Sequence, residues 1–130
     1  MELSIRTSRQ KEMLDITPQA EQAVAKSGAK EGICLVYLPH ATAGIIINEF
    51  EPNIESDFLS AFERLFPKGN WRHNEIDDNA EAHLKSGFAG PGECIPIEGG
   101  RLALGTWQRV LLCEFDGPKN RRVIVKVIRE

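Results

Sequence analysis

The sequence contains few cysteines, few aromatic residues and no long apolar run. Its three cysteines, Cys34, Cys94 and Cys113, are odd in number and form no C-x-x-C pair. They indicate buried thiols in a reducing compartment rather than a disulfide framework or a zinc knuckle. No window reaches the roughly 20 apolar residues of a membrane span, and the first residues show no signal-peptide pattern. We therefore expect a cytoplasmic protein with no membrane partner.

Positive charge is also scarce. The net charge is -3 and the pI is about 5.7, so the chain has no basic field that would attract DNA or RNA. A G-x-S-x-G nucleophile motif and a P-loop are both missing. Cys34 and Cys113 lie inside expected strands, where thiols are usually inert. These absences argue against a nucleic-acid partner and against covalent catalysis.

The residues that are present predict one folded domain, spanning 1–130, with one hydrophobic core. Apolar runs at 32–38 and 43–49 predict buried strands, and RRVIVKVI (121–128) predicts a closing strand buried on both faces. Helical spacing predicts three helices, over 17–28, 52–66 and 79–86. Strands cluster at both ends of the chain. This order predicts an α+β fold with a mostly antiparallel β-sheet or sandwich and three short helices.

The stretch RHNEIDDNAEAHLKS, residues 72–86, holds His73 and His83 on either side of the adjacent Asp77 and Asp78. The simplest interpretation is a loop that enters a helix, and the four residues from Asp78 onward have the capping-box pattern. We assign the cap to Asp78, which leaves Asp77 as the freer carboxylate. This interpretation leaves one aspartate and both histidines unexplained.

A divalent metal ion is one candidate ligand for these side chains. Nitrogen and oxygen donors from His40, His73, His83 and Asp77 would suit zinc or a similar ion. Carboxylates alone would suit magnesium, which keeps several waters and shares phosphate oxygens. The spacing matches no standard zinc signature such as H-E-x-x-H. Zinc and magnesium therefore both stay open as cofactors.

A phosphate group is a second candidate ligand, because Lys85 and Ser86 follow His83 directly and supply a cation and a hydroxyl. Arg121 and Arg122 point to opposite faces of their strand, so at most one of them can join a given site. Arg109 is interpreted as part of a solvated strand face.

The tetrapeptide GTWQ (105–108) joins two apolar runs without a polar turn. This pattern favours Gly105 as a bulge inside a strand and Trp107 as a core residue. Gln108 follows the aromatic residue and could donate a hydrogen bond into a pocket.

Four stretches of the chain resemble the YjbQ-like family, also described as the secondary thiamine-phosphate synthase family. They are HATAGIIINEFEPNIESD, RHNEIDDNAEAHLKS, GECIPIEGGRLALGTWQRVLLCEFDGP and RRVIVKV, and they cover nearly the whole chain in the expected order. GRLALGTWQ together with DDNAEAHLKS is specific. Ala43 is a departure, since relatives often carry serine there, so a hydroxyl is not required at that position.

The resemblance implies a compact α+β fold that assembles as a homotrimer, with a small polar pocket near a subunit boundary. It also implies a weak thiamine-phosphate synthase activity on a small phosphorylated molecule. The catalytic candidates are His40, His73, His83, Asp77 and Asp78. The candidates for binding substrate or phosphate are Thr42, Asn48, Asn79, Lys85, Ser86, Thr106 and Gln108.

Two functions of different classes follow as expectations. The first is a transferase that joins a pyrimidine methyl diphosphate to a thiazole phosphate and releases diphosphate, with metal and cations neutralising the leaving group. The second is a protein that binds a metal or a phosphate and has only incidental synthase activity. In both, the stretch 72–86 supplies half of a site that His40 and the GTWQ segment complete.

Overall fold

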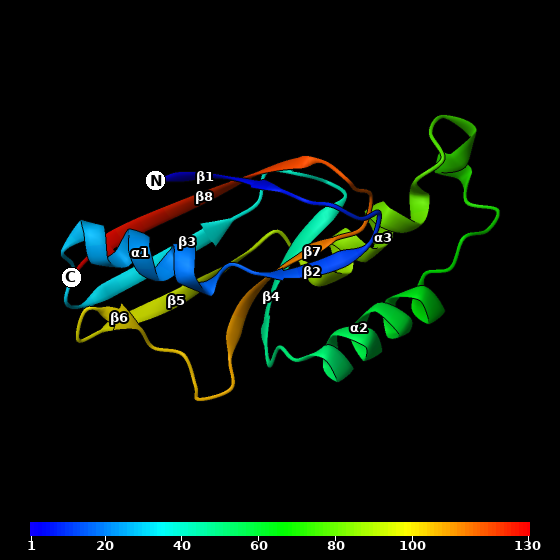
Figure 1. The fold of residues 1–130 in the computed structure, drawn as a ribbon. Helices are drawn as coiled ribbons and strands as arrows, with labels where there is room; N and C mark the ends of the chain where they lie inside the picture. Colours follow the sequence, from blue (N-terminus) through cyan, green and yellow to red (C-terminus); the bar gives the residue numbers. More distant parts are fainter.

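The computed structural model describes residues 1–130 and contains two antiparallel sheets with three α-helices (Figure 1). The larger sheet has the strand order β1-β8-β3-β5-β6, and the smaller sheet has the order β2-β7-β4. The strands are β1 (Glu2–Arg6), β2 (Glu12–Asp15), β3 (Gly32–Tyr37), β4 (Ala43–Asn48), β5 (Gly92–Glu98), β6 (Arg101–Leu102), β7 (Arg109–Glu114) and β8 (Asn120–Arg129). The predicted α+β fold with a mostly antiparallel sheet is confirmed. No helix is long and apolar enough to cross a membrane.

The helices are α1 (Thr17–Ser27), α2 (Pro52–Leu65) and α3 (Ala80–Ala89), and a short 3-10 helix, η1, covers Arg72–Glu75. Proline in the first turn of α1 and of α2 fits the helix start, where a missing backbone N–H leaves no bond unmade. Gly28 ends α1 in the left-handed conformation with φ of 71°, which glycine adopts without strain. These boundaries agree with the predicted helices within a few residues.

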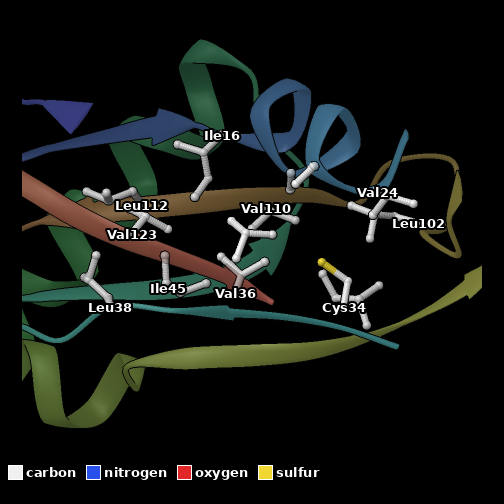
Figure 2. Close-up of a cluster of buried hydrophobic side chains, with 14 of the residues drawn as sticks. Ile16, Val24, Cys34, Val36, Leu38, Ile45, Leu102, Val110, Leu112 and Val123 are labelled. Carbon is white, nitrogen blue, oxygen red and sulfur yellow. The ribbon is translucent and has the colours of Figure 1, made fainter. Parts of the chain in front are cut away.

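The main core lies between the two sheets, with α1 closing one side (Figure 2). Figure 2 shows Val36 and Val123 of the larger sheet beside Ile45 and Val110 of the smaller one. All four are fully buried. A second, smaller cluster around Phe62 and Phe115 holds α2 and α3 against the smaller sheet. The alternation of inward and outward residues along each strand creates both clusters.

The prediction that the closing strand is buried on both faces is wrong. In β8, Val123 and Val125 are buried, but Arg122, Lys126 and Ile128 are exposed. On the neighbouring β3 and β5 the outward residues are also apolar and exposed, and the register places them beside Ile124 and Ile128, with Lys126 between these two opposite Leu35. This strip, called the outer apolar strip below, consists of Ile33, Leu35, Tyr37, Cys94, Pro96, Ile124 and Ile128.

The start and end of α3 both differ from the prediction. Asp78 does not cap the helix; the carboxamide of Asn74 does so, with its Oδ1 accepting the Ala80 N–H at 3.0 Å. Asp77 Oδ1 accepts the N–H of Asp78 at 3.0 Å instead. Gly87 lies inside the helix, which continues to Ala89. A helix packed against β4 tolerates one glycine, because tertiary packing outweighs its low propensity.

The GTWQ segment is a loop, not a strand. Gln108 folds back so that its Oε1 accepts the Gly105 N–H at 2.8 Å, which closes a turn. Trp107 is 71% exposed at this turn, so the prediction that it is a core residue is wrong. Apolar residues on both sides suggested continuity, but β6 and β7 belong to different sheets and the chain must cross between them.

Candidate functional site

A polar site lies where β4, β7 and β8 meet η1 and α3, and a hydrogen-bonded chain of three side chains organises it. Asn79 Nδ2 donates to Asp116 Oδ2 at 3.1 Å, and His73 Nε2 lies 2.9 Å from Asn79 Oδ1. Lys119 Nζ donates to the same carboxylate oxygen at 2.9 Å. Partial burial of Asp116 opposes ionisation, but the bonds from Asn79 and Lys119 outweigh it and lower the pKa of this carboxyl group.

This chain fixes the proton on the His73 ring. An ionised Asp116 can only accept hydrogen bonds, so the amino group of Asn79 must face it. The carbonyl oxygen of Asn79 therefore faces His73, and His73 Nε2 must be the donor. The neutral imidazole then carries a lone pair on Nδ1, which has no hydrogen-bond partner in the structure. His73 is held as a base, or as a metal ligand, through Nδ1.

His83 lies beside His73, with the two ring centroids 4.6 Å apart and the rings inclined by 69°. The ring of His83 forms no hydrogen bond within the chain, and its backbone N–H donates to Asn79 O at 3.3 Å. Asn79 therefore contacts His73 through its side chain and His83 through its backbone carbonyl. Two imidazoles, both half-buried, present nitrogen atoms at one place.

His40 approaches from the end of β3 and has the opposite tautomer. Its Nε2 accepts the backbone N–H of Arg122 at 2.9 Å, so the neutral ring carries its proton on Nδ1. Desolvation and the nearby positive charge of Arg121 lower the pKa of His40 below 6.5. In this arrangement His40 offers a hydrogen-bond donor, and its Nε2 lone pair is not free for a metal.

A buried ion pair supports the floor of the site. Arg121 Nε donates to Glu114 Oε1 at 2.8 Å, and its Nη2 donates to Thr42 Oγ1 at 2.9 Å. Glu114 also accepts the Asp116 N–H at 3.0 Å and the hydroxyl of Thr7 at 2.8 Å. Hydrogen bonds and the charge of Arg121 overcome desolvation and lower the pKa of Glu114. Thr42, which was expected to bind substrate, is buried, and its hydroxyl accepts a hydrogen bond from Arg121 of this pair.

The other predicted residues of this region are placed differently. Asp77 and Asp78 are exposed, and neither carboxylate forms a hydrogen bond with a histidine; Asp77 contacts His73 only through the backbone, with its N–H donating to His73 O at 3.0 Å. No group of three or more His, Cys, Asp or Glu side chains converges on a geometry that would hold a metal. One chain thus brings together two of the four expected ligands, His73 and His83, and the expected full set of His40, His73, His83 and Asp77 is not assembled.

Lys85 and Ser86, expected to bind phosphate, point away from the histidines. Lys85 is fully buried and forms an ion pair with Glu63 of α2, while burial and the neighbouring Lys11 lower its pKa. The hydroxyl of Ser86 donates to Ala43 O at 2.6 Å. Lys85 lies two positions after His83, about 200° around the helix axis, and faces α2. The Ser86 hydroxyl is engaged by β4 through its bond to Ala43. Both side chains stabilise α3 and expose no donor to a phosphate.

Asn48, Thr106 and Gln108 lie at the opposite end of the smaller sheet. Asn48 pairs with Arg109 at one end of the β4–β7 ladder, while Ala43 pairs with Glu114 at the other. Five residue steps along a strand correspond to about 17 Å. Figure 1 shows the β6–β7 loop and the segment around η1 on opposite sides of the molecule. The expectation that GTWQ and His40 complete one site is therefore not met within a single chain.

Comparison with known proteins places the chain in a family. The family model described as "UPF0047 protein YjbQ-like" matches residues 1–130. The chain belongs to the YjbQ-like family. A UPF0047 protein of Archaeoglobus fulgidus is 46% identical, with 98% of this chain and 100% of that protein covered. UPF0047 protein YugU of Bacillus subtilis is 40% identical over 97% of this chain and 96% of the relative.

Solved structures of the YjbQ-like family share the whole fold. The crystal structure of a protein from Sulfolobus solfataricus, described as YbjQ-like and of unknown function, has a TM-score of 0.97 and 43% identity. The structural match covers 100% of this chain and 96% of the Sulfolobus solfataricus chain. A Clostridium acetobutylicum member of the same family has a TM-score of 0.94 and 42% identity, with 98% of this chain and 99% of that one covered. These likenesses establish the family and the fold.

Sequence reasoning missed four residues of this YjbQ-like site: Asp116, Lys119, Glu114 and Arg121. One signal was available, because Glu114 and Arg121 are charged residues inside otherwise apolar strands. A charge in such a place needs a partner, and each is the other's partner. Asp116 and Lys119 lie in a segment, residues 116–119, whose sequence indicated only a turn.

Proposed function

We propose that the histidine site binds a small phosphorylated molecule and that this chain is a transferase of the thiamine-phosphate synthase type. In the proposed reaction a pyrimidine methyl diphosphate joins a thiazole phosphate and diphosphate is released. The observation that carries the proposal is the His73–Asn79–Asp116 chain, which holds a free lone pair on His73 Nδ1 beside His83. The choice of substrates rests on the family resemblance.

The reaction breaks one bond and forms another. The bond between the pyrimidine methylene carbon and the diphosphate oxygen breaks, and its electron pair leaves with diphosphate. The ring nitrogen of the thiazole supplies the electron pair for the new carbon–nitrogen bond. The methylene carbon is cation-like during the transfer, so groups that neutralise the departing diphosphate lower the barrier. A divalent ion, when bound, would supply part of that neutralisation.

The residues of the site suit four tasks in this reaction. The lone pair on His73 Nδ1 accepts a hydrogen bond from the amino group of the pyrimidine and orients the ring. His40, neutral with its proton on Nδ1, donates to a diphosphate oxygen. Lys119 is half-exposed beside Asp116 and adds positive charge at the same place. His83 closes the side of the site next to His73.

A steady-state synthase assay tests the proposal. His73→Gln and His83→Gln are expected to lower kcat/KM at least about tenfold, whereas Arg72→Gln is expected to retain it. Arg72 is the matched control, because it lies next to His73 on η1 and is exposed. Wild-type protein with no synthase turnover, or histidine variants as active as Arg72→Gln, would contradict the transferase proposal.

A metal site is the second candidate, favoured by the two adjacent imidazoles of His73 and His83. Two nitrogen ligands suit zinc better than magnesium. Because one chain supplies no third ligand, water, phosphate or a second copy would fill the remaining positions. Elemental analysis of untagged protein checks this candidate. Zinc that is stoichiometric in the wild type and lost in His83→Gln supports it, and zinc below a tenth of the chain concentration contradicts it.

We also propose that the chain self-associates, as a homotrimer, through the outer apolar strip. Its exposed members on β3, Ile33, Leu35 and Tyr37, continue along the sheet toward His40, so a second copy there would border the histidine site. Contiguous exposed apolar surface on one sheet face is typical of interfaces. Leu35→Glu is expected to yield monomers in sedimentation velocity experiments, and Ser4→Glu on the adjacent β1 is the control. A wild-type monomer would contradict this proposal.

A further inference from the structure

A second polar hollow lies at the end of the smaller sheet that is remote from the histidines. It has a volume of about 490 Å³ and is formed by the start of α1, by β6 and by the β6–β7 loop. Only two of its ten lining residues are hydrophobic. The side chains of Arg101, Arg109, Thr106 and Gln108 line it, together with one carboxylate, Glu21.

Each arginine in the hollow is held by one nitrogen only. Arg109 Nε donates to Asp15 Oδ2 at 2.7 Å, and Arg101 Nε contacts Glu21 Oε2 at 3.4 Å. The terminal nitrogens of both guanidinium groups have no partner in the chain. Since a guanidinium carries five N–H donors in a rigid fork, four donors on each remain for a ligand.

The carboxylates near the hollow are occupied by the protein itself. Glu21 accepts the Leu102 N–H at 2.7 Å in addition to Arg101. Asp15 accepts the Thr17 N–H at 2.9 Å in addition to Arg109. Gln108 uses its carbonyl oxygen on Gly105, so its amino group is left as a donor. The unengaged groups of the hollow are therefore mainly hydrogen-bond donors, and two of them are cationic.

We propose that this hollow, called the arginine hollow below, is a second binding site for the phosphoryl group of a small molecule, separate from the histidine site. Two guanidinium groups, the Gln108 amide and the Thr106 hydroxyl match the several oxygen acceptors of a phosphate or diphosphate. The site does not depend on the proposed synthase activity, because no histidine contributes to it.

Titration of the full chain with inorganic phosphate and with pyrophosphate tests the arginine hollow. Trp107 sits between two lining residues, so its fluorescence reports binding; Trp71→Phe removes the only other tryptophan. We expect a saturable change with a dissociation constant below about 10 mM. The paired variant Arg101→Gln/Arg109→Gln is expected to weaken binding at least about tenfold. Acetate serves as the comparison for a carboxylate ligand.

The control variant Arg64→Gln/Arg129→Gln removes the same charge from two exposed arginines outside the hollow. Binding that persists in this control and weakens in the hollow variant supports the site. Equal weakening in both variants shows a general charge effect and overturns it, as does tighter binding of acetate or no saturable binding by the wild type. His73→Gln should bind as the wild type does, which separates this outcome from that of the synthase assay.

Discussion

The two ends of β7 each carry a charged residue paired with an opposite charge, and the pairs differ in burial. At the histidine end, Glu114 and Arg121 are almost completely buried, and both carboxylate oxygens and two of the guanidinium nitrogens are hydrogen-bonded. At the arginine hollow, Arg109 and Asp15 form the same kind of pair, but the arginine side chain is 42% exposed and its terminal nitrogens are free. The buried Glu114–Arg121 pair is therefore structural, whereas the exposed Asp15–Arg109 pair leaves guanidinium donors that a ligand can reach.

The largest expected effect is on stability at the buried pair. Glu114→Gln should destabilise the fold by about 3–5 kcal/mol, because it leaves Arg121 buried without a counter-charge. Asp15→Asn, which breaks the exposed pair, should cost about 0–1 kcal/mol. Urea denaturation followed by circular dichroism measures both. Equal losses at the two ends would show that burial does not distinguish them.

The next largest effect concerns the orientation of His73. Asp116→Asn gives Asn79 a partner that can donate as well as accept, so the amide of Asn79 is no longer held in one orientation. We expect loss of the single Nε2–H tautomer of His73, measured by ¹⁵N NMR of the ring, and a drop of about tenfold in synthase activity. Lys119→Gln, which leaves the Asp116–Asn79 bond in place, should preserve the tautomer. An unchanged tautomer in Asp116→Asn would refute the positioning role.

A smaller effect is expected from pH. The pKa of His40 is lowered in the fold, so the native state favours the neutral ring and this stabilisation is fully present above pH 6.5. It is lost as pH falls through the lower, folded pKa. The lowered pKa values of Asp116 and Glu114 extend the loss to more acidic pH. His40→Gln should flatten the stability profile below about pH 6.5 and leave the acidic limb unchanged. A profile that keeps its slope there would contradict this assignment.

The least effect is expected from the thiols. Burial raises the pKa of Cys34 to about 11 and that of Cys113 to about 12, so neither forms much thiolate at neutral pH. In the monomeric Leu35→Glu variant only Cys94, which is exposed on the outer apolar strip, should react quickly with a thiol reagent. One cysteine that reacts fast in the folded protein, compared with three in the unfolded protein, confirms this order. In a homotrimer formed through the strip, Cys94 should become slow, and Leu35→Glu should restore its rate.

The elements of the fold were largely readable from local patterns. The strands β3 and β4 follow from β-branched runs, and α2 follows from apolar residues at helical spacing after Pro52. Predictions failed where tertiary contacts outweigh local signals. Gly87 did not end α3 because the helix packs against β4, and Trp107 is exposed because the chain crosses between sheets at that point.

The candidate site was only partly readable. His73 lies six residues before Asn79, and His83 lies four residues after it. Local geometry therefore brings the three side chains together. Asp116 reaches Asn79 from a distant position in the chain, in the turn after β7, and Arg121 pairs with Glu114 and Thr42 nearby. Lys85 and Ser86 were misassigned because their closeness to His83 in sequence did not reveal their tertiary partners, Glu63 of α2 for the lysine and Ala43 of β4 for the serine.

The sequence by itself determined the family, the α+β class and the identity of most elements, because periodicity and motif order are local properties of the chain. Tertiary structure decided which polar residues meet. Folding brought Asp116 to Asn79 beside the histidine pair, and it placed Thr106 and Gln108 in the arginine hollow at the other end of β7, whose Arg109 lies about 17 Å along the strand from Glu114. The stretch from Arg72 to Ser86 thus contributes histidines to one site, while its lysine and serine hold the helix against the core.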